Sequence, residues 1–254
     1  MATYKKRGYK PKTKKEKEEV VEENSTTAEV FNSLDEGASR TEEWVVRNQK
    51  YILGAVGAIA LIVLGYLGYN KIVAEPKQKE AMNEMYMAKS YFDDAVNGMS
   101  SDSLFRMSLE GGEGKFGMLD IVSEYSGTPA ANLANYYAGM AYLNLKDYQN
   151  AVTYLGKFSS DDKMLNPIAK GGIGDAFVQL NQKEEALEYY EKAFKANVND
   201  FTTPLYLMKA ARVAIDLGKN DKALGYLKRI KSEFSASTEA SKADVLIGKV
   251  EASL

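Results

Sequence analysis

The chain has 254 residues, with 33 lysine and arginine residues against 35 aspartate and glutamate residues, and it contains neither cysteine nor histidine. Without these two residue types it can form no disulfide, no thiolate or imidazole metal site, and no Ser-His-Asp or Cys-His catalytic arrangement. The formal net charge of −2 also argues against a nucleic-acid-binding protein, because such proteins carry an excess of basic side chains.

Residues 1–50 form a charged tail with 11 basic and 10 acidic side chains. The stretch from Lys5 to Lys17 holds eight basic residues against one acid and shows no apolar periodicity, which is typical of a disordered, solvated segment. The same basic cluster would also suit contact with anionic lipid head groups, or with an acidic or RNA-bearing partner. Both interpretations of the first 24 residues remain open.

Two short amphipathic helices are predicted in the rest of this tail. Thr26 and Glu29 form a capping-box pattern that starts the first helix, and Gly37 is expected to end it. A second pattern, from Ser39 to Glu42, starts a helix that meets no helix-breaking residue before the apolar segment that follows. We expect this second helix to continue into that segment, or to lie at a membrane surface just before it.

Residues 51–69, YILGAVGAIALIVLGYLGY, are uncharged and apolar and are predicted to form a transmembrane helix. A helix of this length covers about 28 Å, close to the roughly 30 Å hydrocarbon core of a bilayer. Tyrosines near both ends and the flanking Lys50 and Lys71 are residues that favour membrane–water interfaces. No small-residue cleavage site follows, so the segment should remain as an anchor. Small residues that would let another helix approach it are Gly54, Ala58, Gly65 and Gly68.

The orientation of this span rests on the tail, because the basic residues close to its two ends do not differ clearly in number. Short segments rich in lysine and arginine are retained in the cytoplasm, whereas long domains are translocated largely regardless of their charge. The sequence therefore predicts a cytoplasmic tail over residues 1–50 and a domain on the opposite side of the membrane.

The rest of the chain is predicted to be an all-α, tetratricopeptide-repeat-like solenoid of about three to four helix pairs with a closing helix. Three segments align when they are anchored on Ala151, Ala186 and Ala223, and the spacing is close to the roughly 34-residue period of tetratricopeptide repeats. In two of the segments a glycine, Gly139 or Gly174, stands where a small residue lets the helices of a pair approach each other. Each pair leaves an apolar face that only the next pair covers, so several must stack.

Residues 77–254 hold this domain, with further helices on both sides of the aligned segments. Residues 77–96 are predicted to form a leading helix, and residues 115–125 its partner after a glycine-rich connection. Thr238 to Ala252 is predicted to be the closing helix that covers the last exposed face.

The first helices of stacked pairs usually line a concave recognition surface. The repeat register places apolar and polar side chains there together, which suits extended or partly unfolded polypeptides. The lysine and asparagine of carboxylate-clamp domains are replaced by Tyr136, Met140 and Gly171, so no such clamp is expected. The predicted groove residues are Tyr136, Met140, Asn144, Asp175, Gln179, Met208 and Arg212. Burial of individual members in the core is the alternative.

No enzymatic function is predicted. Adjacent acids such as Asp93 with Asp94 and Glu184 with Glu185 point in different directions on a helix and cannot share a site. The sequence shows no activated nucleophile, phosphate-binding loop or metal-binding cluster, and no cofactor is expected.

The layout of tail, single span and repeat domain, together with the stretch ANLANYYAGMAYLNLKDYQNAVTYL, resembles the YfgM family of Gram-negative bacteria. The resemblance covers roughly residues 40–254, and the long tail is an addition to it. It implies an inner-membrane protein with a periplasmic domain that associates with the SecYEG translocon and a PpiD-like chaperone and assists exported polypeptides.

Two other functions remain open on the sequence. One is an oligomeric scaffold that organises another cell-envelope assembly, such as the machinery of division or outer-membrane biogenesis. The other places the function in the basic tail, as a contact with lipid or with the ribosome.

Overall fold

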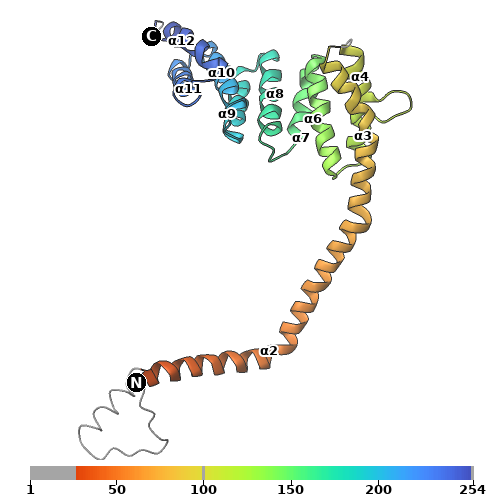
Figure 1. Ribbon diagram of the computed structural model, residues 1–254, viewed down its shortest axis with the longest axis vertical. Coiled ribbons are helices and arrows are strands. Elements are labelled where there is room, and N and C mark those ends of the chain that lie inside the picture. Colours follow the sequence, from red (N-terminus) through yellow and green to blue (C-terminus); the bar gives the residue numbers. More distant parts are fainter. Residues whose placement is uncertain (1–26, 99–100, 253–254) are drawn as a thin grey trace, which may run out of the picture. The chain divides into compact units, whose positions relative to one another are not determined.

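The computed structural model describes residues 27–98 and 101–252, and every regular element in these ranges is a helix (Figure 1). This observation confirms the predicted all-α fold class. Contacts between residues divide the chain after Tyr69 into two units, which are described one at a time. The predicted disordered segment over residues 1–24 lies outside the described residues.

The first unit contains one long helix, α2 (Thr27–Tyr69). The prediction that a short helix ends at Gly37 is wrong, because α2 passes through this residue without interruption. A single glycine weakens a helix by about 1 kcal/mol relative to alanine, which does not end the helix when the residues on both sides continue it. The prediction that the second helix runs into the apolar segment is confirmed.

The apolar part of α2 is exposed along its length. Side chains such as Leu61 and Ile62 are 72% exposed, and the most apolar window of the helical run Glu43–Val96 has a mean hydropathy of 2.1 with none of it buried. Soluble domains rarely leave so large an apolar surface uncovered. The described part of the chain therefore contains one helix that is long and apolar enough to cross a membrane.

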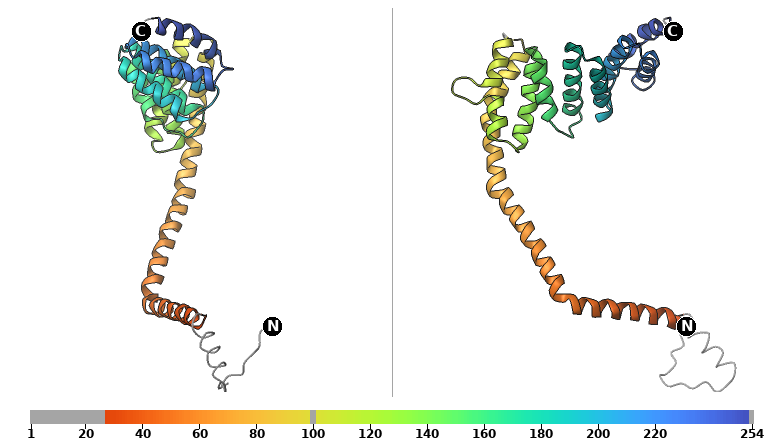
Figure 2. Two further views of the ribbon diagram at one scale, coloured as in Figure 1. Left: turned by 90° about the vertical axis from the view of Figure 1, so that its left-hand side faces the viewer. Right: turned by 180° about the vertical axis from the view of Figure 1, so that it is seen from behind.

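The second unit is an α-solenoid in which helices follow one another in pairs along the chain (Figure 2). The three aligned segments correspond to the pairs α6 with α7, α8 with α9, and α10 with α11. The elements of this unit are η1 (Asn70–Ala74), α3 (Glu75–Val96), α4 (Ser101–Glu110), α5 (Met118–Glu124), α6 (Pro129–Asn144), α7 (Tyr148–Lys157), α8 (Leu165–Gln179), α9 (Lys183–Ala196), α10 (Thr202–Asp216), α11 (Asn220–Glu233) and α12 (Thr238–Glu251).

The leading pair differs from the prediction. The sequence predicts residues 115–125 as the partner of α3, but the structure pairs α3 mainly with α4, while the short α5 packs mainly against α6. The rings of Phe92 in α3 and Phe105 in α4 meet edge to face, with centroids 5.6 Å apart. The sequence does not predict α4 because the segment contains serines, which favour turns. Ser108 is nevertheless fully buried in this helix.

The closing helix α12 is confirmed and begins at the predicted residue, Thr238. It packs against both α10 and α11, and Ala243 and Val250 are buried in this contact region. The Ser237 hydroxyl accepts a hydrogen bond from the backbone N–H of Ala240, which caps the first turn of α12. The apolar face of the last pair is thereby covered, as a stacked repeat requires.

The helices of each pair approach most closely where small residues stand at their crossing. A Cβ atom at Gly139 in α6 would lie 2.5 Å from the Leu155 side chain of α7. A Cβ atom at Gly174 in α8 would lie 2.6 Å from the Tyr190 ring of α9. Non-bonded carbon atoms prefer about 3.5–4.0 Å, so these positions tolerate only glycine without a shift. The anchoring alanines of the second helices are all fully buried, namely Ala151, Ala186 and Ala223.

The turn inside each pair has one shared backbone geometry. The residues with positive φ are Lys146, Asn181 and Gly218, at 63°, 58° and 69°. In each turn the next backbone N–H donates to the carbonyl five residues earlier, at 2.9, 2.9 and 2.8 Å. This arrangement is a Schellman motif, and it ends the first helix of every pair in the same way. The backbone therefore repeats with the same spacing as the anchoring alanines.

Replacement of Gly171 tests the packing between successive pairs. A Cβ atom there would lie 1.9 Å from the Tyr206 ring, so Gly171→Ala should lower the free energy of unfolding by about 1–3 kcal/mol through overpacking. Gly225→Ala is the matched control, because Gly225 also lies inside a helix but has open space beside it. The control should stabilise the domain by roughly 0.5–1 kcal/mol. Urea unfolding of the detergent-solubilised protein measures both, and equal effects would contradict the packing.

Candidate partner-binding site

A hollow of about 370 Å³ opens between the first helices of two successive pairs, α6 and α8. Its lining comes from the end of α6, the turn into α7, the last turns of α8 and one residue of α9. The lining residues are Leu143, Asn144, Lys146, Tyr148, Asp175, Val178, Gln179 and Tyr190. Three of the predicted groove residues, Asn144, Asp175 and Gln179, therefore meet in one place. We call it the α6–α8 hollow.

Two exposed amide side chains give this hollow its hydrogen-bonding capacity. Asn144 and Gln179 are both exposed, and the Asn144 Nδ2 donates to the Met140 carbonyl at 2.8 Å, which orients the amide. An amide carries two N–H donors and a carbonyl acceptor, the same groups that a peptide main chain must pair. Leu143 and Val178 add partly buried apolar surface beside them. The hollow can thus contact both the main chain and an apolar side chain of a ligand.

Asp175 is held in the hollow by side chains from two other helices. Its Oδ1 accepts a hydrogen bond from the Tyr190 hydroxyl of α9 at 2.7 Å. Both of its carboxylate oxygens accept from the Lys209 ammonium of α10 at 2.7 Å. The charge of Asp175 is therefore already paired, and its main effect is to join α8, α9 and α10.

Two tyrosine rings complete this cluster. The rings of Tyr190 and Tyr206 stack with centroids 6.2 Å apart, and the Lys209 ammonium lies 5.9 and 5.6 Å from the two centroids. Burial, reinforced by the Asp175 carboxylate, raises the pKa of the Tyr190 hydroxyl. The hydroxyl therefore stays protonated and keeps its role as a donor to Asp175 across the physiological pH range.

The other predicted groove residues do not join the α6–α8 hollow. Tyr136 and Met208 are only 8% and 5% exposed and belong to the core, which was the alternative that the sequence left open. Met140 is partly buried, and Arg212 is exposed on α10. For the exposed members, contact with a partner stays a prediction.

The small residues predicted to pack the membrane helix against another helix lie on its open surface. Cβ atoms added at Gly54, Gly65 and Gly68 would meet nothing within 4 Å, and Ala58 is exposed. These positions would therefore admit a second helix at close range, and their role in packing stays a prediction.

Three residues that line the hollow were not predicted from the sequence to belong to a site. These residues are Lys146, Tyr148 and Tyr190, none of which is among the predicted groove residues. Lys146 has a positive φ, which a lysine in the sequence does not signal. In the described residues, no group of three or more Asp, Glu, His or Cys side chains is placed to hold a metal ion.

Comparison with known families agrees with the repeat geometry. A family model described as tetratricopeptide repeat matches residues 172–238, and another of the same description matches residues 133–162. These two ranges contain most of the helix pairs from α6 to α11. A search of curated proteins finds no match. The chain thus carries tetratricopeptide repeats, an architecture that supports a protein–protein interaction module, together with one helix capable of spanning a membrane.

Glu191 of α9 links the second aligned pair to the third. Its Oε1 accepts from the Tyr226 hydroxyl at 2.6 Å and from the Lys222 ammonium at 3.2 Å, both in α11, while Oε2 accepts from Lys195 at 3.0 Å. Burial alone would raise the pKa of this carboxyl, but the hydrogen bonds from Tyr226 and the two lysines outweigh burial and lower the pKa from 4.5 to about 2. The ionised form of Glu191 therefore stabilises the contact between α9 and α11.

This pKa shift predicts a defined loss of stability in acid. Because the folded-state pKa lies below the unfolded value, the contribution of Glu191 is fully present above about pH 4.5 and is lost as the pH falls toward about 2. Glu191→Gln should lower the melting temperature at pH 6, and the difference from the natural protein should shrink across that window. Glu188→Gln is the control on the same helix, since Glu188 makes one exposed pair with Lys192. A difference that stays constant with pH would contradict the assignment.

Proposed function

We propose that this protein is a membrane-anchored adaptor that binds a segment of a partner polypeptide in the α6–α8 hollow. The observation that carries the proposal is the meeting of Asn144 and Gln179, two exposed amides on successive first helices, beside Asp175. Repeats of this class commonly recognise partners with the surface that their first helices form.

An extended segment fits this hollow better than a folded surface. Its volume of about 370 Å³ is near the lower end of ligand-binding pockets, which suits one or two side chains together with their main chain. An extended segment leaves main-chain N–H and C=O groups unpaired, and the amides of Asn144 and Gln179 offer partners for both. Val178 and Leu143 would take apolar atoms of the same segment.

The cellular setting of the proposal comes from the resemblance to the YfgM family and from the charge of the tail. In this setting α2 anchors the protein in a bacterial inner membrane, the basic tail stays in the cytoplasm, and the repeat domain lies in the periplasm. There the domain associates with the SecYEG translocon and a PpiD-like chaperone, and it assists polypeptides that emerge from the translocon. The exposed apolar surface of α2 and the tetratricopeptide repeats support this proposal.

Photo-crosslinking from the hollow tests the partner. A benzophenone amino acid in place of Gln179 should give adducts with subunits of SecYEG, with a PpiD-like chaperone or with exported chains, identified by mass spectrometry. The control is the same amino acid in place of Thr153, an exposed residue of α7 that does not line the hollow, and it should give few adducts.

The outcomes of this experiment test three parts of the proposal separately, namely the translocon as partner, the adaptor function and the binding site. Adducts with a different envelope assembly would contradict the translocon part and keep the adaptor part. Adducts between copies of this chain alone would favour an oligomeric scaffold instead. Equal yields from the two positions would contradict the α6–α8 hollow as the binding site.

Thiol labelling tests the orientation without background, because the natural chain contains no cysteine. Ser232→Cys, on the exposed surface of α11, should react with a membrane-impermeant maleimide in cells whose outer membrane has been permeabilised. Thr13→Cys, in the tail, should react only after the inner membrane is disrupted. The reverse labelling pattern would contradict the proposed orientation.

A further inference from the structure

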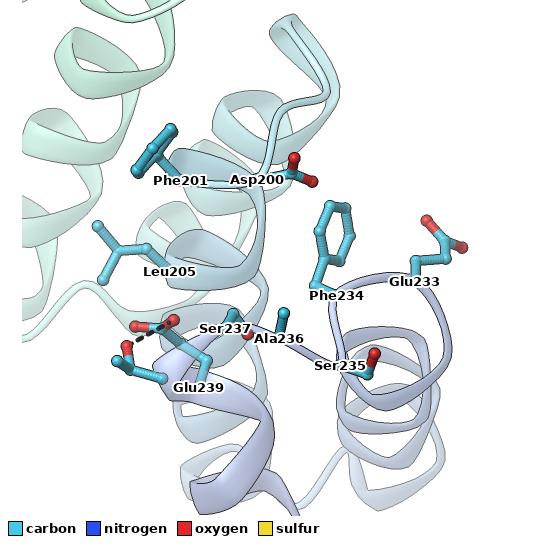
Figure 3. Close-up of a pocket in the computed structure, with 10 residues that line it drawn as sticks. Asp200, Phe201, Leu205, Glu233, Phe234, Ser235, Ala236, Ser237 and Glu239 are labelled. Atoms are coloured by element: carbon cyan, nitrogen blue, oxygen red, sulfur yellow. Dashed lines mark hydrogen bonds between the residues drawn. The ribbon is translucent and has the colours of Figure 1, made fainter.

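A second hollow, of about 560 Å³, lies at the other end of the aligned pairs, where the start of α10 faces the turn from α11 into α12 (Figure 3). Its apolar surface comes from Phe201 and Leu205 on one side and Phe234 on the other. None of its lining residues belongs to the α6–α8 hollow. We call it the α10–α12 hollow.

The Phe201 side chain is exposed to solvent and does not belong to the core of the domain. Its side chain is 76% exposed, whereas Phe234 across the hollow is only 7% exposed. An exposed aromatic ring gives up apolar contact that burial would provide, and such rings are frequent anchors at binding surfaces. The ring of Phe201 is therefore available to a ligand, and the buried Phe234 contributes apolar surface to the same hollow from the end of α11 (Figure 3).

The backbone that carries Phe201 is held by a dense set of hydrogen bonds from Asn199. The Asn199 Oδ1 accepts from the backbone N–H of Phe201 at 2.9 Å and of Thr202 at 2.8 Å. Its Nδ2 donates to the Thr202 hydroxyl at 2.7 Å, and its own backbone N–H donates to the Thr203 hydroxyl at 2.9 Å. The turn is thus ordered before any ligand arrives, which lowers the entropic cost of binding.

The charged side chains that line this hollow are acidic. They are Asp200, Glu233 and Glu239, and among the described residues no lysine or arginine belongs to the lining. Glu233 is partly neutralised, because its Oε2 accepts from Arg229 Nε at 2.9 Å. Glu239 accepts a hydrogen bond from the neutral Thr238 hydroxyl at 3.0 Å. The lining therefore combines apolar walls with a negative rim, and a ligand that matches both must be apolar and positively charged.

We propose that the α10–α12 hollow is a second peptide-binding site, which takes a segment of a partner polypeptide with apolar side chains next to lysine or arginine. Apolar side chains of that segment pack against Phe201 with Leu205 on one side of the hollow and against Phe234 on the other. The neighbouring lysine or arginine pairs with Asp200 and Glu239, for which long basic side chains have the reach. This site goes beyond the proposed function, because it commits to the charge of the bound segment and does not depend on the α6–α8 hollow.

Peptide binding to the full chain in detergent micelles tests this site. The probe is a fluorescent peptide, GSLKLRLSG, and its affinity is measured by fluorescence anisotropy. We expect binding that weakens as the salt concentration rises from about 0.05 to about 0.3 M, because screening weakens exposed charge pairs. A second peptide in which glutamate replaces both basic residues should bind at least tenfold more weakly, and a third with serine in place of leucine should lose binding as well.

Variants of the protein test whether the peptide binds in the α10–α12 hollow. Phe201→Ala should weaken binding of GSLKLRLSG at least tenfold while leaving the melting temperature unchanged, because this ring is exposed. Asp200→Asn combined with Glu239→Gln should remove most of the salt dependence. Val198→Ala is the control, since Val198 is a similarly exposed apolar residue of the same loop outside the lining, and it should bind as the natural protein does.

Three results would overturn the proposal. The first is equal affinity of the natural protein for the basic and the acidic peptide. The second is unchanged affinity in Phe201→Ala. The third is loss of binding in Gln179→Ala but not in Phe201→Ala, which would place the peptide in the α6–α8 hollow and leave the proposed function intact. Conversely, failure of crosslinking from Gln179 with normal peptide binding here would contradict the proposed function alone.

Discussion

The close approach of paired helices is the constraint on which the repeat domain depends. Gly174 has no side chain at the point where the Tyr190 ring crosses α8, and a methyl group there would lie 2.6 Å from that ring. Because the ring passes over Gly174, its hydroxyl reaches Asp175 at 2.7 Å. The packing of the helices and the candidate site are therefore linked. Gly174 permits the Tyr190 ring to cross α8, and the same ring holds the neighbouring Asp175 carboxylate in position.

Successive pairs also pack through a tyrosine ring that lies against a glycine, but here the two residues belong to different pairs. Tyr206 of α10 lies directly against the backbone of α8 at Gly171, stacks on Tyr190, and has the Lys209 ammonium beside its ring. Lys209 in turn binds Asp175. Aromatic packing and one partly exposed ion pair thus hold α8, α9 and α10 together.

The repeat core could be predicted from the sequence because it follows local spacing. A small residue on one helix and an alanine on the next recur at similar spacings, and the buried Ala151, Ala186 and Ala223 confirm that interpretation. The register alone could not tell which residues the neighbouring helix covers, so Tyr136 and Met208 were placed in a groove although they lie in the core. The apolar pattern also failed to predict α4, because the polar Ser108 stands on its buried face.

The α10–α12 hollow was beyond prediction for a different reason. Its walls come from the start of α10 and from the turn between α11 and α12, which are about thirty residues apart in the sequence and come together in the folded domain. Sequence periodicity describes helix faces, whereas Phe201 lies in the connection before a helix, at a position that Asn199 defines through side-chain hydrogen bonds. The sequence shows only an apolar residue in a loop, and it does not indicate that the turn from α11 into α12 lines the same hollow.

The two hollows and the packing of Tyr206 are separate features of the repeat domain. The α6–α8 hollow lies at the ends of α6 and α8, and the α10–α12 hollow lies where the start of α10 faces the turn from α11 into α12, whereas the Tyr206 ring of α10 packs against Gly171 within α8. The lack of a side chain at Gly171 lets the Tyr206 ring approach the backbone of α8 and join the core. The two candidate sites differ in chemistry, since exposed amides line the α6–α8 hollow whereas apolar and acidic side chains line the α10–α12 hollow. A partner that used both would be recognised by two separated short segments, and each could be lost without the other.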